Sequence, residues 1–246
     1  MKSDRDPADM PTRVPSQLPE AGAEAASPTP GRTALGAFSR RAFVAGLPLL
    51  AAACISRPAS YDIRTDPRYI ATYGPMPNER FPIPAVNIAR IEPQFLRRVV
   101  DFTGDEAPGT IVIETEHRFL YLVLEPGKAL RYGIGVGKEG MAFRGRAVIG
   151  RKAEWPNWTP TRNMMALNPD LRAYAGGMGP GLGNPLGARA LYLARGGRET
   201  NYRIHGTNEP WTIGHAVSSG CIRMINQDVI DLYNRVPVGT KVVVLE

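Results

Sequence analysis

Apolar and polar residues alternate in short runs along the second half of this 246-residue chain. Residues 110–114 and 119–124 are separated by a polar turn, and residues 129–136 follow with the two-residue period of a half-buried strand. Four more runs have the length and composition of strands, at residues 146–150, 190–193, 202–205 and 241–245. Many short strands with few helices predict a mostly β domain, a sandwich or barrel, over residues 109–246.

Helical spacing is found in two places. Residues 226–236 begin with Asn226, which can cap a helix, and end before Pro237. The apolar face of this helix would consist of Val229, Ile230, Leu232 and Tyr233. Residues 93–100 show a weaker pattern that starts at Pro93, a favourable first position for a helix. We therefore expect one or two short helices beside the strands.

The first part of the chain lacks this regularity. Residues 1–38 are rich in proline, alanine and serine, and such a stretch buries too little surface to offset its ordering entropy. Arg40 and Arg41 then precede an apolar run at residues 42–53, which is too short to span a bilayer. The combination is typical of a twin-arginine (Tat-type) export signal. The alternative is a solvated basic turn before a short buried helix.

Three regions follow from these patterns. Residues 1–53 are interpreted as an unstructured start and an export signal, and residues 109–246 as the β domain. Residues 54–108 contain many prolines, which disfavour long regular elements. We expect this Pro-rich lead segment either to wrap the domain or to space it from the membrane.

Charge adds little to this interpretation. The formal net charge is +7 and the sequence pI is about 9.6, which would suit a nucleic acid, an acidic membrane surface or an anionic cell-wall polymer. The chain has no lysine-rich run and no nucleic-acid-binding signature, so we predict no nucleic-acid partner.

The two cysteines are more informative. Cys54 follows Leu50-Ala51-Ala52-Ala53 in an imperfect lipobox, so that lipid attachment at Cys54, with a membrane anchor, and plain signal cleavage both stay open. In either case Cys221 has no partner for an internal disulfide. Such a thiol is either a small buried apolar group or a reactive one.

The residues around Cys221 favour a nucleophile. A thiol attacks an acyl carbon as its thiolate, and it needs a base or a lowered pKa. His205, followed by Gly206, ends an apolar strand and can present an imidazole at the rim of the sheet. Ser218, Ser219 and Gly220 are small enough to let backbone N–H groups approach a developing oxyanion. A helix that begins after Cys221 would favour its ionised form.

These residues resemble the signature of the L,D-transpeptidase (YkuD) family. That signature has a histidine and a glycine, a spacer, and then Ser-His-Gly-Cys followed by Ile-Arg-Met. This chain keeps His205, Gly206, Ser218, Gly220, Cys221, Ile222, Arg223 and Met224, and it differs at Ser219, where a second histidine is common. Residues 155–161 and 184–188 and the opening hairpin from about Ile111 are also similar to the family.

The resemblance implies a peptidoglycan enzyme without a cofactor. His205 would be the base, and Cys221 would form a thioester with a tetrapeptide stem, release D-Ala and pass the stem to an amine, giving 3–3 cross-links. β-Lactams of the penem type would be covalent inhibitors. Arg223 is interpreted as a binder of substrate carboxylate or carbonyl groups, and Trp211 as an aromatic that lines the substrate site.

Each assignment has an alternative. Cys221 could be an inert core thiol, and His215, six residues before it, is a rival base in a loop. Arg223 could form only a surface salt bridge, and His117 is expected in a surface turn. Three histidines with one mature cysteine lack zinc-site spacing, so we predict no metal. The glycine-rich residues 176–183 are expected to form a flap over the cleft.

Alternatives also remain for the function. Water as the acceptor would give an L,D-carboxypeptidase or a hydrolase that cuts such links, and a protein amine would give attachment of a protein to the cell wall. A papain-like or NlpC-like peptidase fits less well, because those place Cys before His. A peptidoglycan-binding module that has lost activity is favoured only by Ser219.

Overall fold

The computed structural model describes residues 62–137, 143–216 and 221–245. Several predicted features lie outside these ranges: the export signal, Cys54, Ser218, Ser219 and Gly220. Within the described ranges, no helix has both the length and the apolar character needed to cross a membrane.

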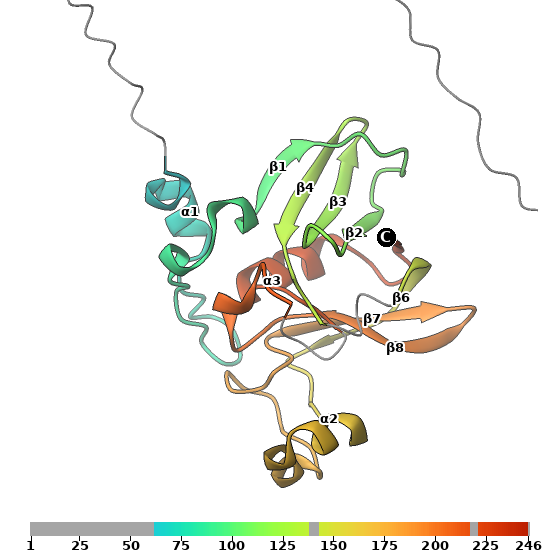
Figure 1. Cartoon of the computed structure of the whole chain (residues 1–246). Coiled ribbons are helices and arrows are strands. Elements are labelled where there is room, and N and C mark those ends of the chain that lie inside the picture. Colours follow the sequence, from blue (N-terminus) through green and yellow to red (C-terminus); the bar gives the residue numbers. More distant parts are fainter. Residues whose placement is uncertain (1–61, 138–142, 217–220, 246) are drawn as a thin grey trace, which may run out of the picture. The chain divides into compact units, whose positions relative to one another are not determined.

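The described residues form one mixed sheet whose strands lie in the order β1–β4–β3–β2–β10–β6–β7–β8–β9–β5 (Figure 1). Neighbouring strands are antiparallel, except that β10 is parallel to β2 and β8 is parallel to β9. The predicted mostly β architecture is therefore confirmed. The bounds are β1 (Arg98–Asp101), β2 (Ile111–Glu114), β3 (Phe119–Glu125), β4 (Lys128–Gly133), β5 (Gly135–Val136), β6 (Gly145–Glu154), β7 (Arg189–Arg195), β8 (Arg198–His205), β9 (Ile222–Arg223) and β10 (Lys241–Leu245).

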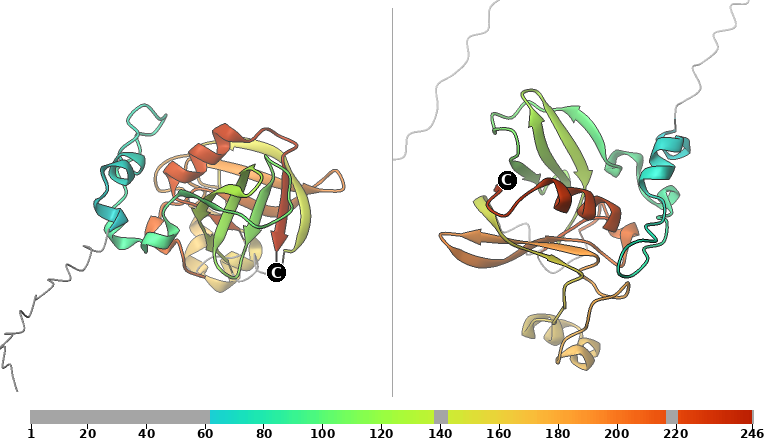
Figure 2. Two further views of the ribbon diagram at one scale, coloured as in Figure 1. Left: turned by 90° about the horizontal axis from the view of Figure 1, so that it is seen from above. Right: turned by 180° about the vertical axis from the view of Figure 1, so that it is seen from behind.

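Three α-helices accompany the sheet: α1 (Pro67–Thr72), α2 (Arg162–Leu167) and α3 (Asn226–Arg235). The helix predicted at residues 226–236 is confirmed by α3, which lies between the β1–β4 half of the sheet and the β6–β8 half (Figures 1 and 2). Its Val229 and Leu232 belong to a buried cluster with Ile113 from one half and Leu191 from the other. Burial of α3 between the two halves therefore makes the main core.

Short 3-10 turns connect these elements. They are Ile63–Thr65, Ile88–Arg90, Pro93–Phe95, Pro169–Tyr174 and Pro210–Thr212. Proline at the first position of three of these turns fixes the backbone φ and needs no hydrogen-bond acceptor there.

The helix predicted at residues 93–100 is wrong. The structure has a 3-10 turn at Pro93–Phe95 and strand β1 from Arg98. Val99 and Val100 pair with Leu130 and Ala129 of β4. β-Branched residues suit a strand, and edge pairing with β4 outweighs the local helical spacing.

The single strand predicted at residues 129–136 is divided into β4 and β5. Gly133 lies against the backbone of Phe95, where a side chain would clash, and Gly135 lies against the backbone of Thr212. The chain can bend between these glycines, so β5 leaves β4 and pairs with β9, with Val136 opposite Ile222. The bend carries one end of the predicted strand to the segment that follows Cys221.

Residues 62–98 pack against the strands and α3 through two apolar clusters. Phe95 and Leu96 share one cluster with Ile213 of the loop between His205 and Cys221 and with Ile225, which precedes α3. The second cluster joins Ile83 to other buried groups, Trp155, Ala188 and Ile230.

Polar contacts strengthen this packing. Arg189 of β7 forms a largely buried ion pair with Glu79, with 2.8 Å between Nη2 and Oε1. Arg97 approaches two carboxylates of α3, with 3.6 Å from Nε to Asp228 Oδ1 and 2.7 Å from Nη1 to Asp231 Oδ2. The Pro-rich lead segment is thus held by apolar and ionic contacts from residue 62 onward.

Candidate active site

His205 is the last residue of β8 and is almost fully buried, with 4% of its surface exposed. Its backbone is fixed from both sides, because it pairs with Ala190 of β7 and with Arg223 of β9. The His205 backbone oxygen also accepts a hydrogen bond from Met224 N at 2.8 Å. The backbone of His205 is therefore held on both sides at the end of the predicted strand.

Cys221 lies immediately before β9, beside β8. Because Ile204 is opposite Ile222 and the strands are parallel, Cys221, Arg223, Arg203 and His205 share one face of the sheet. The register puts the Cα atoms of Cys221 and His205 about 8 Å apart, one strand across and two residues along. Cys221 is partly exposed, and its Sγ lies 3.9 Å from Asn201 O. The register thus places the predicted nucleophile and base beside each other on neighbouring strands, on one face of the sheet.

The hydrogen bond of His205 defines its tautomer. Nδ1 lies 2.6 Å from the backbone oxygen of Gly206, and a carbonyl oxygen can only accept, so the proton is on Nδ1. Nε2 is then left with a lone pair. A neutral imidazole in this state can take a proton at Nε2.

The electrostatic surroundings keep His205 neutral. Its pKa is lowered from 6.5 to about 3, mainly by burial; the hydrogen bond to Gly206 opposes this change, and the positive charges of Arg223 and Arg203 add to it. At neutral pH the imidazole therefore holds no second proton. A neutral imidazole with so low a pKa is a weak base.

Gly206 is needed for a steric reason as well. A Cβ at this position would collide with Asn226 Oδ1 and approach Ala188 N. Gly187 lies against the same side-chain amide of Asn226. It has a φ of +61°, and a side chain at this position would also clash with Asn226. Two glycines thus leave room for the half-buried amide of Asn226 beside the turn that follows His205.

Asn226 uses that room to join three segments. Its Oδ1 accepts a hydrogen bond from Ala188 N at 3.0 Å, and its Nδ2 donates to Thr207 O at 3.0 Å. The expected cap at the start of α3 is therefore wrong, since the cap residue is Ile225 and makes no side-chain hydrogen bond. The amide instead fixes the turn after His205.

The expected influence of α3 on Cys221 is weakened by the intervening strand. Strand β9 separates Cys221 from the first residue of α3, Asn226. The helix dipole acts mainly within its first turn.

Arg223 is largely buried and faces the loop between His205 and Cys221. Its Nη1 lies 3.3 Å from Glu209 Oε2, with 17% of the arginine side chain exposed. The arginine thus already binds one carboxylate, that of Glu209, and its charge acts on His205. Arg203 adds a second guanidinium on the same face of the sheet. Such a pair would attract a substrate that carries carboxylates.

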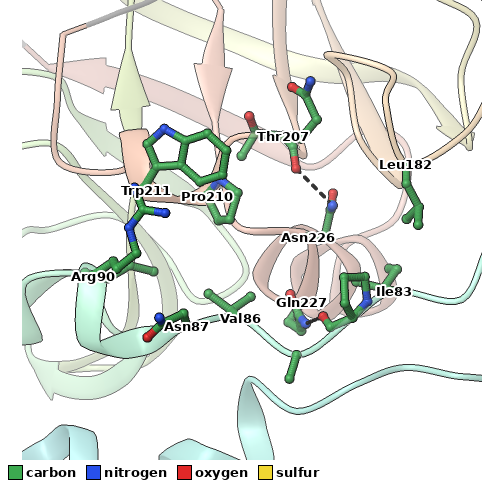
Figure 3. A pocket seen from close by; sticks show the side chains of 14 residues that line it. Ile83, Val86, Asn87, Arg90, Leu182, Thr207, Pro210, Trp211, Asn226 and Gln227 are labelled. Carbon is green, nitrogen blue, oxygen red and sulfur yellow. Dashed lines mark hydrogen bonds between the residues drawn. The ribbon is translucent and has the colours of Figure 1, made fainter.

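Trp211 lies in the 3-10 turn Pro210–Thr212, and 43% of its surface is exposed. It lines a pocket of about 280 Å³ together with Thr207, Asn208 and residues 83–87. Figure 3 shows Trp211 beside Arg90, whose guanidinium carbon is 5.0 Å from the ring centroid. Trp211 therefore belongs to a pocket whose lining does not include Cys221 or His205.

The other two histidines differ from His205. His215 is exposed, and it contacts the sheet through its backbone oxygen, which accepts from Val136 N at 3.3 Å. His117 lies in the β2–β3 turn, and its Nδ1 is 2.8 Å from Glu114 Oε1. Neither ring is fixed among buried groups as that of His205 is.

Sequence reasoning missed the roles of Asn184, Gly187 and Asn226. Asn184 is buried, and its Nδ2 donates to Pro156 O at 3.0 Å and Gly179 O at 2.9 Å. These two hydrogen bonds hold the glycine-rich residues 176–183 close to Pro156, which follows β6. The similarity of residues 184–188 to the family was a signal of importance, but the contacts with Asn226 are long-range.

A histidine with an unprotonated Nε2 and a cysteine beside the neighbouring strand are the types of residue that a cysteine acyl-transfer enzyme uses as base and nucleophile. The family model of the L,D-transpeptidase catalytic domain, YkuD, matches residues 108–244, more than half of the chain. The chain belongs to the YkuD family of L,D-transpeptidase catalytic domains.

Individual relatives agree with this assignment. The probable L,D-transpeptidase YbiS of Escherichia coli (strain K12) is 37% identical over 141 residues, covering 54% of this chain and 43% of that protein. The probable L,D-transpeptidase ErfK/SrfK of the same organism is 35% identical over 144 residues, covering 56% of this chain and 44% of that protein. The alignments therefore span less than half the length of these two curated relatives.

A solved structure from Brucella melitensis is 54% identical and covers 65% of this chain and 99% of that one, with a TM-score of 0.44. It is described as a probable carnitine operon oxidoreductase. We do not carry that description over, because the family model and the curated relatives agree on an L,D-transpeptidase domain.

Proposed function

We propose that this protein is an exported L,D-transpeptidase that uses Cys221 to transfer peptidoglycan stem peptides. The observation that carries the proposal is the position of Cys221 beside a buried, neutral His205 whose Nε2 can accept a proton. Membership of the family supports peptidoglycan as the substrate. The donor would be a tetrapeptide stem, and the acceptor an amine of a second stem.

In the first half-reaction the Cys221 sulfur attacks the carbonyl carbon of the third residue of the donor stem. A C–S bond forms as the thiol proton moves to His205 Nε2. The C–N bond to the terminal D-Ala then breaks, and His205 returns the proton to the leaving amine. The product is a thioester on Cys221 and free D-Ala.

In the second half-reaction the acceptor amine attacks the thioester carbon. His205 Nε2 takes a proton from the amine, the C–S bond breaks, and the thiolate of Cys221 recovers that proton. The new amide bond is a 3–3 cross-link. Backbone N–H groups of residues 218–221 are proposed to hold the oxyanion in both steps, as the resemblance to the family implies.

The charges beside the site support a carboxylate-bearing donor. Arg203 and Arg223 face the same side of the sheet as Cys221, and Arg223 is already paired with Glu209 at 3.3 Å. A donor carboxylate could exchange with Glu209 for the guanidinium, because Glu209 is 45% exposed and loses little on release to water.

Water or a protein amine could replace the stem amine in the second step, which would give a carboxypeptidase or a protein-attaching enzyme with the same two residues. Export through Arg40 and Arg41, with or without a lipid on Cys54, would bring the protein to the periplasm where stem peptides lie. Cytoplasmic accumulation of the precursor when both arginines are replaced by lysine would support that route, and normal export would contradict it.

Covalent trapping tests the proposed nucleophile. Incubation with a penem should add the mass of one inhibitor to the intact protein, at a peptide that contains Cys221. The Cys221→Ala variant should fold normally and gain no mass, because alanine replaces a small side chain without strain. Equal labelling of Cys221→Ala would show that Cys221 is not the acylated residue.

A further inference from the structure

Arg203 of β8 is the direct neighbour of Cys221 across the sheet. The parallel register that places Ile204 opposite Ile222 also places residue 203 opposite residue 221. Both isoleucines belong to the main core, so Arg203 and Cys221, which precede them, point to the opposite face. Neighbouring strands lie about 4.8 Å apart. The arginine is therefore attached one strand spacing from the proposed nucleophile.

Tyr192 of β7 fixes the Arg203 side chain from the other side. The tyrosine lies opposite Arg203, whose guanidinium carbon is 5.0 Å from the centroid of the ring. Arg151 of β6 flanks the same tyrosine, with its guanidinium carbon 3.5 Å from the centroid. Tyr192 is 6% exposed, so it offers both guanidiniums a fixed surface on which to pack. The charge of Arg203 is thereby held at the sheet surface.

Arg203 differs from the two other arginines of this face because no carboxylate is paired with it. Arg223 is paired with Glu209 at 3.3 Å, and Arg151 with Glu199 at 3.6 Å. The guanidinium of Arg203 forms no ion pair or hydrogen bond with the residues that the structure describes. A half-buried cation without a counter-charge is unfavourable. An anionic group bound at this point would therefore be stabilised.

The two terminal nitrogens of Arg203 are the atoms that a ligand can reach. Within the described ranges, Nε is the one nitrogen of this guanidinium that is both enclosed and unpaired. Nη1 and Nη2 make no hydrogen bond with described residues, so both must have surface open to solvent. Together they form a fork that matches the two oxygens of a carboxylate. Unlike Arg223, this fork has no carboxylate such as Glu209 to exchange.

The donor stem carries a carboxylate at the right distance. In the proposed reaction, the bond that breaks joins the third residue to the terminal D-Ala. The carboxylate of that D-Ala is one residue, about 3.3–3.6 Å of chain, from the carbonyl that Cys221 attacks. Cys221 and Arg203 are one strand spacing apart, about 4.8 Å. A leaving group of one residue therefore spans the gap between the sulfur and the fork.

We propose that Arg203 binds the C-terminal carboxylate of the donor stem and so selects donors from which a single residue departs. A stem with one further D-Ala would place its carboxylate a residue beyond the fork, and a C-terminal amide would offer no charge. The identity of the ligand rests on the proposed function, whereas the unpaired guanidinium beside Cys221 is a feature of the structure. Arg203 would thus be a specificity residue outside the motif that contains Cys221.

Calorimetric titration of the full chain carrying Cys221→Ala tests this assignment without acyl transfer. The ligands are the soluble tetrapeptide stem that ends in D-Ala, the same peptide with a C-terminal amide, and the pentapeptide with one further D-Ala. The tetrapeptide should bind at least about tenfold more tightly than the other two, because each of them loses the charged hydrogen bonds to the fork. Addition of Arg203→Gln should reduce this preference to less than about threefold and change the affinity for the amide less than about threefold.

Two further variants separate the fork from charge alone. Arg198 is an exposed arginine of the same strand, five residues before Arg203, so Arg198→Gln removes an equal charge and should keep the preference of about tenfold. Arg203→Lys keeps the charge without the fork and should retain a preference of about threefold. The proposal is overturned if the tetrapeptide does not bind, if acid and amide bind equally well, or if Arg203→Gln keeps the full preference.

A merely structural role of Arg203 predicts a different result. Arg203→Gln would then weaken binding of the acid and the amide by the same factor, and this outcome would also overturn the proposal. Failure of the transpeptidase proposal is distinguishable, because binding is measured without turnover. A carboxylate preference that depends on Arg203, in a protein that releases no D-Ala and is not acylated by a penem, would support this assignment and contradict only the proposed reaction.

Discussion

At the scale of single residues, His205 is controlled mainly by the groups that fix it. Its Nδ1–H is held by Gly206 O, its backbone by β7 and β9, and its pKa by burial and two arginines. The low pKa of about 3 makes the resting imidazole a weak base. In the proposed mechanism its contribution would therefore come from position, with proton transfer coupled to attack by the thiol.

Replacement of each histidine separates the two candidate bases. His205→Ala should lower the rate of acylation by a penem by about two to four orders of magnitude, the usual effect of losing a positioned acid–base group. His215→Ala should cost less than about tenfold, because its exposed side chain is not fixed toward the thiol. Stopped-flow fluorescence measures both rates. A larger loss in His215→Ala would mean that His215 is the base.

The contact between Gly206 and Asn226 can be tested in the same way. Gly206→Ala should lower the free energy of unfolding by about 1–3 kcal/mol, because the added Cβ meets the Asn226 amide in a packed site. It should also slow acylation, because the Gly206 carbonyl orients His205. The matched control is Gly176→Ala, where nothing lies within 4 Å of an added Cβ. Denaturant unfolding with equal midpoints for the two variants would contradict this account.

How much of this site was predictable follows from the range of the interactions. The motif around Cys221 and the strand that ends at His205 are local, so spacing and residue type identified them. The bond from Asn226 to Ala188 spans 38 residues along the chain, and no local pattern signals it. Asn226 at the start of a helix looks like a cap, and only the packed fold shows that its amide points elsewhere.

At the scale of elements, α3 connects the lead segment to the sheet through buried charges. Asp228 on α3 is fully buried and faces Arg97 and Tyr73 of the lead segment, while Asp231 of the same helix accepts from Tyr132 of β4 at 2.7 Å. The Tyr73 hydroxyl also accepts from Arg97 N at 2.7 Å. Burial raises the pKa of Asp228 from 3.8 to about 7, against the opposing effect of Arg97.

This raised pKa predicts a pH dependence of stability. The folded state keeps a proton on Asp228 that the unfolded chain loses near pH 3.8, so the stabilisation is complete below that pH and is lost as the pH rises through about 7. Asparagine does not titrate. The free energy of unfolding of the wild type should therefore fall relative to Asp228→Asn between pH 4 and pH 8.

Urea unfolding of both proteins across this range measures the difference, and all other titrating groups, including His205, are common to the pair. A constant difference would mean that Asp228 has an ordinary pKa in the folded state. A difference of opposite sign would mean that Arg97 dominates and keeps the carboxylate charged.

Elements of the sheet were easier to predict than those of the lead segment. Short apolar runs identified most strands, and β2, β7 and β10 are buried at consecutive positions, that is, on both faces. The segment 93–100 was misjudged, because Val99 and Val100 form an edge strand with β4, a partner about 30 residues away. The long-range pairing that decides such cases is absent from any local window.

At the scale of the whole molecule, a sheet that wraps around α3 brings the two ends of the active-site motif together, and the lead segment supports the loop between them. Phe95 and Ile213 share one cluster, so the docking of residues 62–98 and the shape of the loop after His205 are coupled. The described lead segment is thereby part of the structure that positions the site. Which acceptor attacks the proposed thioester depends on the whole enzyme together with its substrate.

Muropeptide analysis of purified sacculi incubated with the protein tests the central claim most directly. The account predicts new 3–3 cross-linked dimers together with release of D-Ala, and neither product with the Cys221→Ala variant. Conversion of tetrapeptide stems to tripeptides without dimers would indicate a carboxypeptidase that uses the same thioester. Dimers formed equally by Cys221→Ala, or no change in the muropeptides with the wild-type protein, would contradict the proposed transpeptidase.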